Sequence, residues 1–386
     1  MGIARGTLSN NNGDQRLLPF KADGSLCASL YALQRGGVHL KCLSLTPSDA
    51  GRMWLSLADT ALLDTVHDQT WIEKYGDLGV LRVGDGVSCI YTSADAISLR
   101  DCERMTMLNL AVHVAKGGAC EEGGVGAHLW KNCYFGPRPG TCQWQGGDGF
   151  MFNATRHGTT MDHVTVSHST DDIINIHGYW SLVESVDGSS VRFTKAHGHR
   201  LMPPDLTVGD GAIFLARDTG VVLGQASIVR IDKDRVELNQ SAASFSNAVV
   251  AWPDHECAGW LVQNCDWHDN YQRIFIQSGP GVLRHCTVTR SGSGVEIGYD
   301  MPYVEGGRPC GITIQDNRFV NVNTSSPRGG VIAAHTCTFA KRDVAQIENV
   351  SITGNAFDWP VEEAVVLKCV KDAVISGDRI NEHVNK

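Results

Sequence analysis

The sequence lacks any run of 18 apolar residues, and its first 20 residues lack the continuous apolar segment of a secretory signal. The first absence argues against a membrane-spanning helix. The second predicts a cytoplasmic protein, or a secreted or periplasmic one whose signal has been removed. Basic residues do not outnumber acidic ones, since the net charge is −9, and we therefore expect no nucleic-acid partner.

Metal-binding cysteine patterns are also absent. The 13 cysteines include no CxxC pair and no zinc-type spacing. Several follow Asn or His in strand-like text, as Cys133, Cys265 and Cys286 do. We interpret these as small buried residues stacked in a core. The sequence therefore predicts no metal site and no cofactor.

What the sequence does contain is a recurring six-residue phrase: apolar, any, polar, small or apolar, any, apolar. Its landmark residues are Asn109, Asn132, His163, Asn264, His285, Asp316 and Gly354. Consecutive landmarks lie 21 to 38 residues apart, with one gap of 101 residues. Alternation with period two indicates strands, and the spacing is typical of a solenoid. The intervals are too short for the helices of a doubly wound α/β fold.

These features predict an all-β chain folded as a right-handed parallel β-helix. The long gap holds a strand set of its own, which we interpret as a small antiparallel β-barrel inserted into one turn of the helix. We expect an N-terminal cap and first coils in residues 1–90, with a short helix in LSLADTALLDTV (55–66). The β-helix then occupies residues 91–178 and 257–386, and the barrel occupies residues 179–256.

Three carboxylates stand out in the text GDGFMFNATRHGTTMDHVTVSHSTDDIINIHG (147–178): Asp148, Asp171 and Asp172. Asp148 and Asp171 are about one coil apart, so they should lie side by side on adjacent coils, roughly 4.8 Å between strands. A bend at residues 170–172 would place Asp171 and Asp172 together on the outside.

Side-chain alternation after this bend separates the two faces of the strand. It predicts that Ile174 and Ile176 point inward, while Asp171, Ile173, Asn175 and His177 share the outer face.

Clustered carboxylates disfavour one another's ionisation, so one member can stay protonated as a general acid while another activates water. Glycoside hydrolysis needs this division of labour. Secondary candidates for substrate binding are Asn175, His177, Arg138, Trp144, Glu296 and Glu305.

The words DGF (148–150), DDIINIHG (171–178) and VGDGAIF in the inserted segment resemble glycoside hydrolase family 110, which comprises inverting exo-α-galactosidases on a β-helix. The text QRIFIQSGPGVL (272–283) and SGVEIGYDMPYVEGGRPCGITIQDNRF (293–319) continues the resemblance, which spans roughly residues 80–360. It implies an inverting glycosidase acting on an α-galactoside-like neutral glycan.

The aspartates are also similar to the triad of polygalacturonases. That resemblance implies Asp171 as general acid, with Asp148 and Asp172 holding the water. Arg273 would match their substrate-binding arginine, but the sequence here reads Arg-Ile-Phe instead of Arg-Ile-Lys, which argues against an acidic sugar.

Other functions remain open. An intramolecular glycosyl transferase, such as a fructotransferase, would release a cyclic sugar. A uronate lyase or epimerase would need a basic residue and often calcium, yet no Lys lies near the triad in sequence. A non-catalytic carbohydrate-binding or tailspike-like β-helix would bind glycan without turnover. Each of these readings makes carbohydrate the partner, and none determines the oligomeric state.

Overall fold

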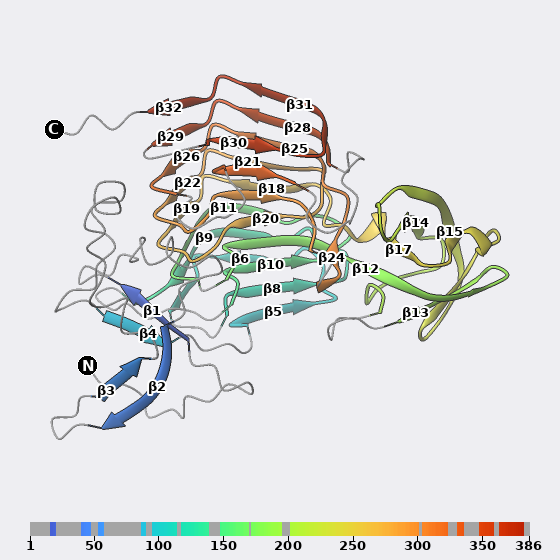
Figure 1. Cartoon of the computed structure of the whole chain (residues 1–386), viewed down its shortest axis with the longest axis horizontal. Coiled ribbons are helices and arrows are strands. Elements are labelled where there is room, and N and C mark those ends of the chain that lie inside the picture. Colours follow the sequence, from blue (N-terminus) through green and yellow to red (C-terminus); the bar gives the residue numbers. More distant parts are fainter. Residues whose placement is uncertain are drawn as a thin grey trace.

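The structure is a computed structural model. It describes residues 16–20, 40–47, 53–57, 86–89, 95–113, 117–138, 147–169, 171–194, 201–300, 303–322, 330–335, 347–358 and 363–381. Figure 1 shows the coils stacked one on another, with the colour changing from cyan to red along the stack. None of the helices among these residues is long and apolar enough to cross a membrane.

Three ladders of parallel strands build this stack, which confirms the predicted β-helix. The first ladder contains, in order, β5 (Ile97–Arg100), β8 (Ala119–Glu122), β10 (Phe150–Asn153), the start of β12 (Ile174–Asp187), β20 (Ile274–Ile276), β23 (Val295–Ile297), β27 (Ile332–Ala334) and β30 (Val365–Leu367).

The second ladder contains β6 (Thr106–Leu108), the first halves of β9 (Leu129–Gly136) and β11 (Thr160–Ser167), β18 (Trp260–Gln263), β21 (Gly281–Arg284), β25 (Cys310–Gln315), β28 (Ile347–Thr353) and β31 (Val370–Ser376). The third contains β7 (Ala111–His113), the second halves of β9 and β11, β19 (Asp266–His268), β22 (Thr287–Thr289), β26 (Arg318–Val320), β29 (Ala356–Asp358) and β32 (Arg379–Asn381).

The landmark residues of the repeat form the bend between the second and third ladders. All seven have positive φ, from 52° at Asp316 to 70° at Gly354. Asn, Asp, His and Gly tolerate this left-handed conformation better than branched residues do, which explains why these types recur there.

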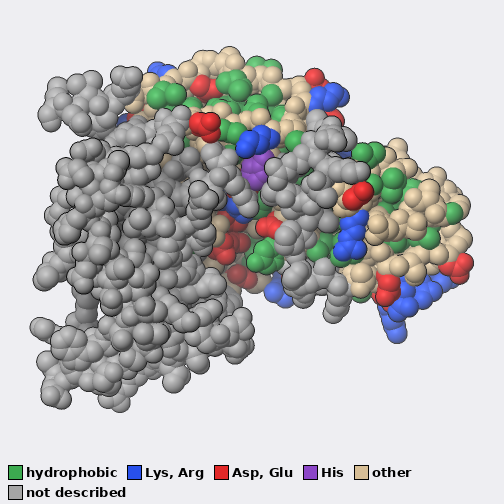
Figure 2. Space-filling view, viewed as in Figure 1, with side chains coloured by type: hydrophobic (Ala, Val, Ile, Leu, Met, Phe, Trp, Pro, Cys, Tyr) green, Lys and Arg blue, Asp and Glu red, His purple; other side chains and the backbone are tan. Residues whose placement is uncertain are grey.

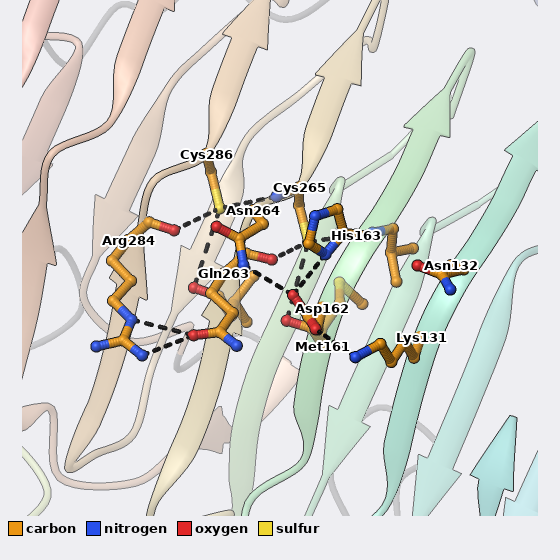
Figure 3. A network of polar contacts seen from close by, with 12 residues as sticks. Lys131, Asn132, Met161, Asp162, His163, Gln263, Asn264, Cys265, Arg284 and Cys286 are labelled. Carbon is orange, nitrogen blue, oxygen red and sulfur yellow. Dashed lines mark hydrogen bonds and ion pairs between the residues drawn. The ribbon is translucent and has the colours of Figure 1, made fainter. Parts of the chain in front are cut away.

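The cysteines that follow three of these landmarks are buried, as predicted, and none of the three forms a disulfide. They also connect the coils, because the backbone N–H of Val164 donates to Cys265 Sγ and that of Cys265 to Cys286 Sγ, each at 3.4 Å. Figure 3 shows this stack beside Asp162, which accepts from Asn264 Nδ2 at 2.8 Å.

Inward-facing side chains of matching register form the core. Phe150, Ile174, Ile274 and Val295 lie side by side on the first ladder, and all are at most 2% exposed. Burying a side chain of this size contributes about 1.5–3 kcal/mol, so each additional coil stabilises the stack.

The inserted segment forms a closed antiparallel barrel of its own. The end of β12, β13 (Ser190–Thr194), β16 (Arg235–Leu238), β15 (Val222–Asp232), β14 (Gly211–Ala216) and β17 (Ala248–Ala251) pair in a ring that returns to β12. Two short 3-10 helices, η2 (Ala243–Phe245) and η3 (Pro253–His255), flank β17. Inside the ring, Phe214 stacks on Phe245 at 3.9 Å. Because β12 runs unbroken from β-helix to barrel, the boundary at residue 179 remains a prediction.

The described strands of residues 1–90 form a separate antiparallel sheet. Its members are β1 (Arg16–Phe20), β2 (Leu40–Pro47), β3 (Met53–Leu57) and β4 (Gly86–Cys89). The predicted helix at residues 55–66 is wrong for its first three residues, which end β3. Its remaining residues lie outside the described part of the chain.

Candidate active site

The three predicted aspartates lie together at the corners that precede β10 and β12. One carboxylate oxygen from each of Asp148, Asp171 and Asp172 can be chosen so that all three atoms lie within 4.8 Å of one another. The backbone N–H of Asp172 donates to Asp148 Oδ1 at 3.2 Å. A Cβ at Gly149 would lie 2.6 Å from the carbonyl oxygen of Ile173. Glycine at this position of the DGF word therefore allows the two coils to approach closely beside the triad.

The chain bends here, but the bend leaves only Asp171 exposed, so the expectation that Asp172 also lies on the outside was wrong. The bend also extends further than predicted. Strand β12 begins only at Ile174, and both Ile173 and Ile174 are fully buried in the core. Placing Ile173 on the outer face was therefore wrong, because strict alternation does not apply where the chain turns a corner. Asn175 follows the alternation and lies opposite Phe275 on the outer row.

The three carboxyl groups differ in environment. Asp171 is exposed, Asp148 is half-buried and Asp172 is 5% exposed. Burial raises the pKa of Asp148 well above its usual range, and the charges of Asp171 and Asp172 add to that shift. Burial also raises the pKa of Asp172, although the Arg273 guanidinium opposes the shift. The cluster can therefore hold a proton and a negative charge side by side near neutral pH.

Arg273 lies between two carboxylates on the outer face of the first ladder. Its Nε is 3.2 Å from Asp172 Oδ1, and its Nη1 pairs with Glu296 Oε2. The guanidinium carbon lies 3.9 Å from the centre of the Phe275 ring, which adds a cation–π contact. Because these contacts hold Arg273 from three sides, its charge is directed at the protein's own carboxylates.

Glu305 reaches the same face from β24 (Glu305–Gly306), which pairs antiparallel with β12. Its Oε2 accepts from Asn175 Nδ2 and from Gln277 Nε2, each at 3.1 Å. The charge of Glu305 also raises the pKa of Asp148. The structure thus places the predicted site residues in two sets of contacts near the triad: Asn175 and Glu305 share hydrogen bonds with Gln277, and Glu296 pairs with Arg273.

The remaining predicted residues are less closely joined. His177 follows Asn175 on β12, is 1% exposed, and contacts the Gly178 carbonyl through Nδ1 at 3.0 Å. Arg138 is exposed just beyond β9. Trp144 lies outside the described residues.

Two residues of this face were missed from the sequence: Gln277 and His335. His335 Nε2 lies 2.8 Å from Glu296 Oε1. A signal was available, because each follows a strand triplet, IFI or IAA, whose first and third residues face the core, as His177 follows INI. Figure 2 shows acidic side chains gathered on this face of the molecule, with a histidine and basic side chains beyond them toward the C-terminal coils.

Carboxylate oxygens at this spacing could also hold a hard cation. Arg273 already supplies a positive charge beside Asp172, however, so the triad has a counter-charge without a metal. The arrangement is suited to acid/base chemistry.

Comparison with known proteins adds solved structures only, because no family model and no curated protein matches the chain. Three phage tailspikes have a partly similar structure. That of Pseudomonas phage phi297 is 12% identical, with 60% of this chain and 42% of that chain covered and a TM-score of 0.15. That of Pseudomonas phage LKA1 is 8% identical, with 73% and 54% covered and a TM-score of 0.16.

The third is the tailspike of the Acinetobacter baumannii phage AP22, solved in complex with a capsular saccharide. It is 10% identical, with 73% of this chain and 48% of that chain covered and a TM-score of 0.16. The matches thus span about half the length of these tailspikes. Likeness at these scores carries no argument about the chemistry of the site.

Proposed function

We propose that this chain is a glycoside hydrolase that cleaves a neutral glycan by acid/base catalysis at Asp148, Asp171 and Asp172. The observation that carries the proposal is the approach of three carboxylate oxygens to within 4.8 Å of one another. General acid and base groups must both reach the scissile bond, and such a cluster supplies both. The resemblance to glycoside hydrolase family 110 points to an α-galactoside.

The environments of the three groups suggest their roles. Asp171 is the exposed member, so it is the one best placed to protonate the leaving oxygen of a bound glycan. The Arg273 guanidinium beside Asp172 favours the ionised form of that carboxyl group, against the effect of burial. Asp148 and Asp172 then hold the attacking water between them.

Charge on this face supports a neutral sugar. Arg273 is already shared by Asp172 and Glu296, and Glu305 adds a further carboxylate. An acidic sugar would approach several negative groups and find the nearby cation already paired. Uronates and sulfated sugars are therefore disfavoured as substrates.

The test is hydrolysis of defined neutral oligosaccharides, with aryl α-galactosides first, by wild type and by Asp148→Asn, Asp171→Asn and Asp172→Asn. We expect each variant to lose about 10²–10⁴-fold in kcat. Asp316→Asn, which changes an exposed carboxylate at a distant bend, is the matched control and should keep wild-type activity. Full activity in all three triad variants would disprove the proposal.

Product analysis resolves the stereochemistry and the alternatives. Inverting pairs of carboxyl groups are typically about 6.5–9.5 Å apart and retaining pairs roughly 5–5.5 Å apart. The resemblance implies inversion, so the anomer first released, followed by NMR, decides between the two. An anhydro sugar would indicate intramolecular transfer, and glycan binding without turnover would indicate a binding module.

A further inference from the structure

A chain of four polar side chains runs from the triad across four successive coils of the first ladder. It comprises Asp172, Arg273, Glu296 and His335. The Asp172–Arg273 contact is 3.2 Å, Arg273 pairs directly with Glu296, and Glu296 Oε1 lies 2.8 Å from His335 Nε2. Their side chains are between 7% and 15% exposed, so solvent screens these interactions only weakly.

Strand register holds these four side chains in place. Glu296 lies between Phe275 and Ala333 on the outer row, and His335 directly follows the inward-facing Ala334. The ring of Phe275 supports the guanidinium of Arg273 from below. The four groups are therefore carried by rigid strands that the core fixes on their inner side.

The two oxygens of Glu296 are divided between two partners, Arg273 and His335. If the His335 contact were lost, this buried carboxylate would interact more strongly with Arg273. Arg273 would then be drawn toward Glu296 and away from Asp172. Burial and the charges of Asp171 and Glu305 oppose the ionisation of Asp172, and Arg273 is the neighbour that favours it.

We propose that His335 is a positioning residue of the catalytic centre, which acts through Glu296 to hold Arg273 beside Asp172, where the guanidinium favours the ionised form of that carboxyl group. This inference rests on the proposed function, because it assigns a role in that reaction. His335 itself does not need to touch the substrate. Its contribution is the close contact of its Nε2 with Glu296 Oε1, which offsets part of the charge of Glu296 when the ring is protonated.

The kinetic test compares His335→Leu with His335→Gln, whose amide can still donate to Glu296. For His335→Leu we expect kcat to fall about 10–100-fold, with KM within about twofold of wild type and the acid limb of the pH profile moved to higher pH. His335→Gln should retain most of the activity. Equal losses in both variants, or an unmoved acid limb in His335→Leu, would overturn the proposal.

A second measurement separates this inference from the proposed function. NMR titration of the His335 ring in the resting protein needs no turnover. In Asp172→Asn, Arg273 is free to pair fully with Glu296, so the His335 ring should lose its proton at lower pH than in wild type. His285, an exposed ring on another ladder, is the internal control. An unchanged His335 titration would show that the charge of Asp172 does not affect His335 through Arg273 and Glu296, whether or not any glycan is cleaved.

Discussion

Replacing Glu121 with glutamine is expected to stabilise this protein at neutral and alkaline pH. Glu121 belongs to the inward row of the first ladder, beside Leu99 and Phe152, and is 0% exposed. Its Oε1 accepts from Trp130 Nε1 at 2.7 Å, and its Oε2 accepts from the Thr159 hydroxyl. Two hydrogen bonds do not replace the water that a carboxylate loses inside an apolar core. Burial therefore raises the pKa of Glu121 from 4.5 to about 7.

The sign and size of the effect follow from linkage. Because the folded-state pKa of Glu121 is raised, the contribution of its protonated carboxyl group to the stability of the fold is fully present below pH 4.5. That contribution is lost as the pH rises through about 7. The corresponding free energy is about 3 kcal/mol once the group is fully ionised. Glutamine keeps an acceptor for Trp130 and a polar partner for Thr159 but never ionises, so Glu121→Gln should escape this loss.

Denaturant unfolding of wild type and Glu121→Gln, near pH 5 and near pH 8.5, measures the effect. We expect the two proteins to differ by less than about 1 kcal/mol at the lower pH and by about 3 kcal/mol in favour of the variant at the higher pH. Glu184→Gln, which changes an exposed barrel carboxylate paired with Arg192, should stay within about 0.5 kcal/mol of wild type at both. If the gap between wild type and Glu121→Gln does not widen with pH, the burial argument is wrong.

Three further outcomes are expected. Asn132→Val should lower the free energy of unfolding by about 1–2 kcal/mol more than Asn132→Gly, because residue 132 has a φ of 53°; equal denaturation midpoints would contradict the left-handed bend. Arg156→Met should destabilise the barrel by about 1–3 kcal/mol and increase its proteolysis, because Arg156 binds both Asp205 and Asp210; unchanged cleavage would count against this junction. A chelator should leave glycan hydrolysis unchanged, since the triad is proposed to act without a metal, and lost activity would favour a lyase.

The repeat was readable from the sequence because it is a local steric requirement. Each coil must bend once between the second and third ladders, and the bend needs positive φ. Asn132, His163 and Gly354 all adopt positive φ, so the six-residue pattern recurs although the residue type at the bend differs. The apolar residues on either side alternate because the core lies on one face, and this periodicity is also local.

The triad was also within reach, since Asp148 is about one coil from the adjacent Asp171 and Asp172, and all three lie next to strongly patterned strands. The details of the corner were not. Alternation predicts faces only within a strand, and β12 starts two residues after Asp172. The corner consequently buries Ile173, which a count of residues alone would place outside.

What the sequence by itself determined is the coil: its period, its bend and the stacking of aspartates about one coil apart. Only the tertiary structure decided which distant side chains meet. Asn175 and Glu305 are separated by 130 residues, and their contact depends on the path of β24 across the outer face. The same is true of His335 and of the buried Glu121. The physical reason is that these contacts join segments far apart in the sequence, across connections of unequal length, so a local pattern does not give their relative positions.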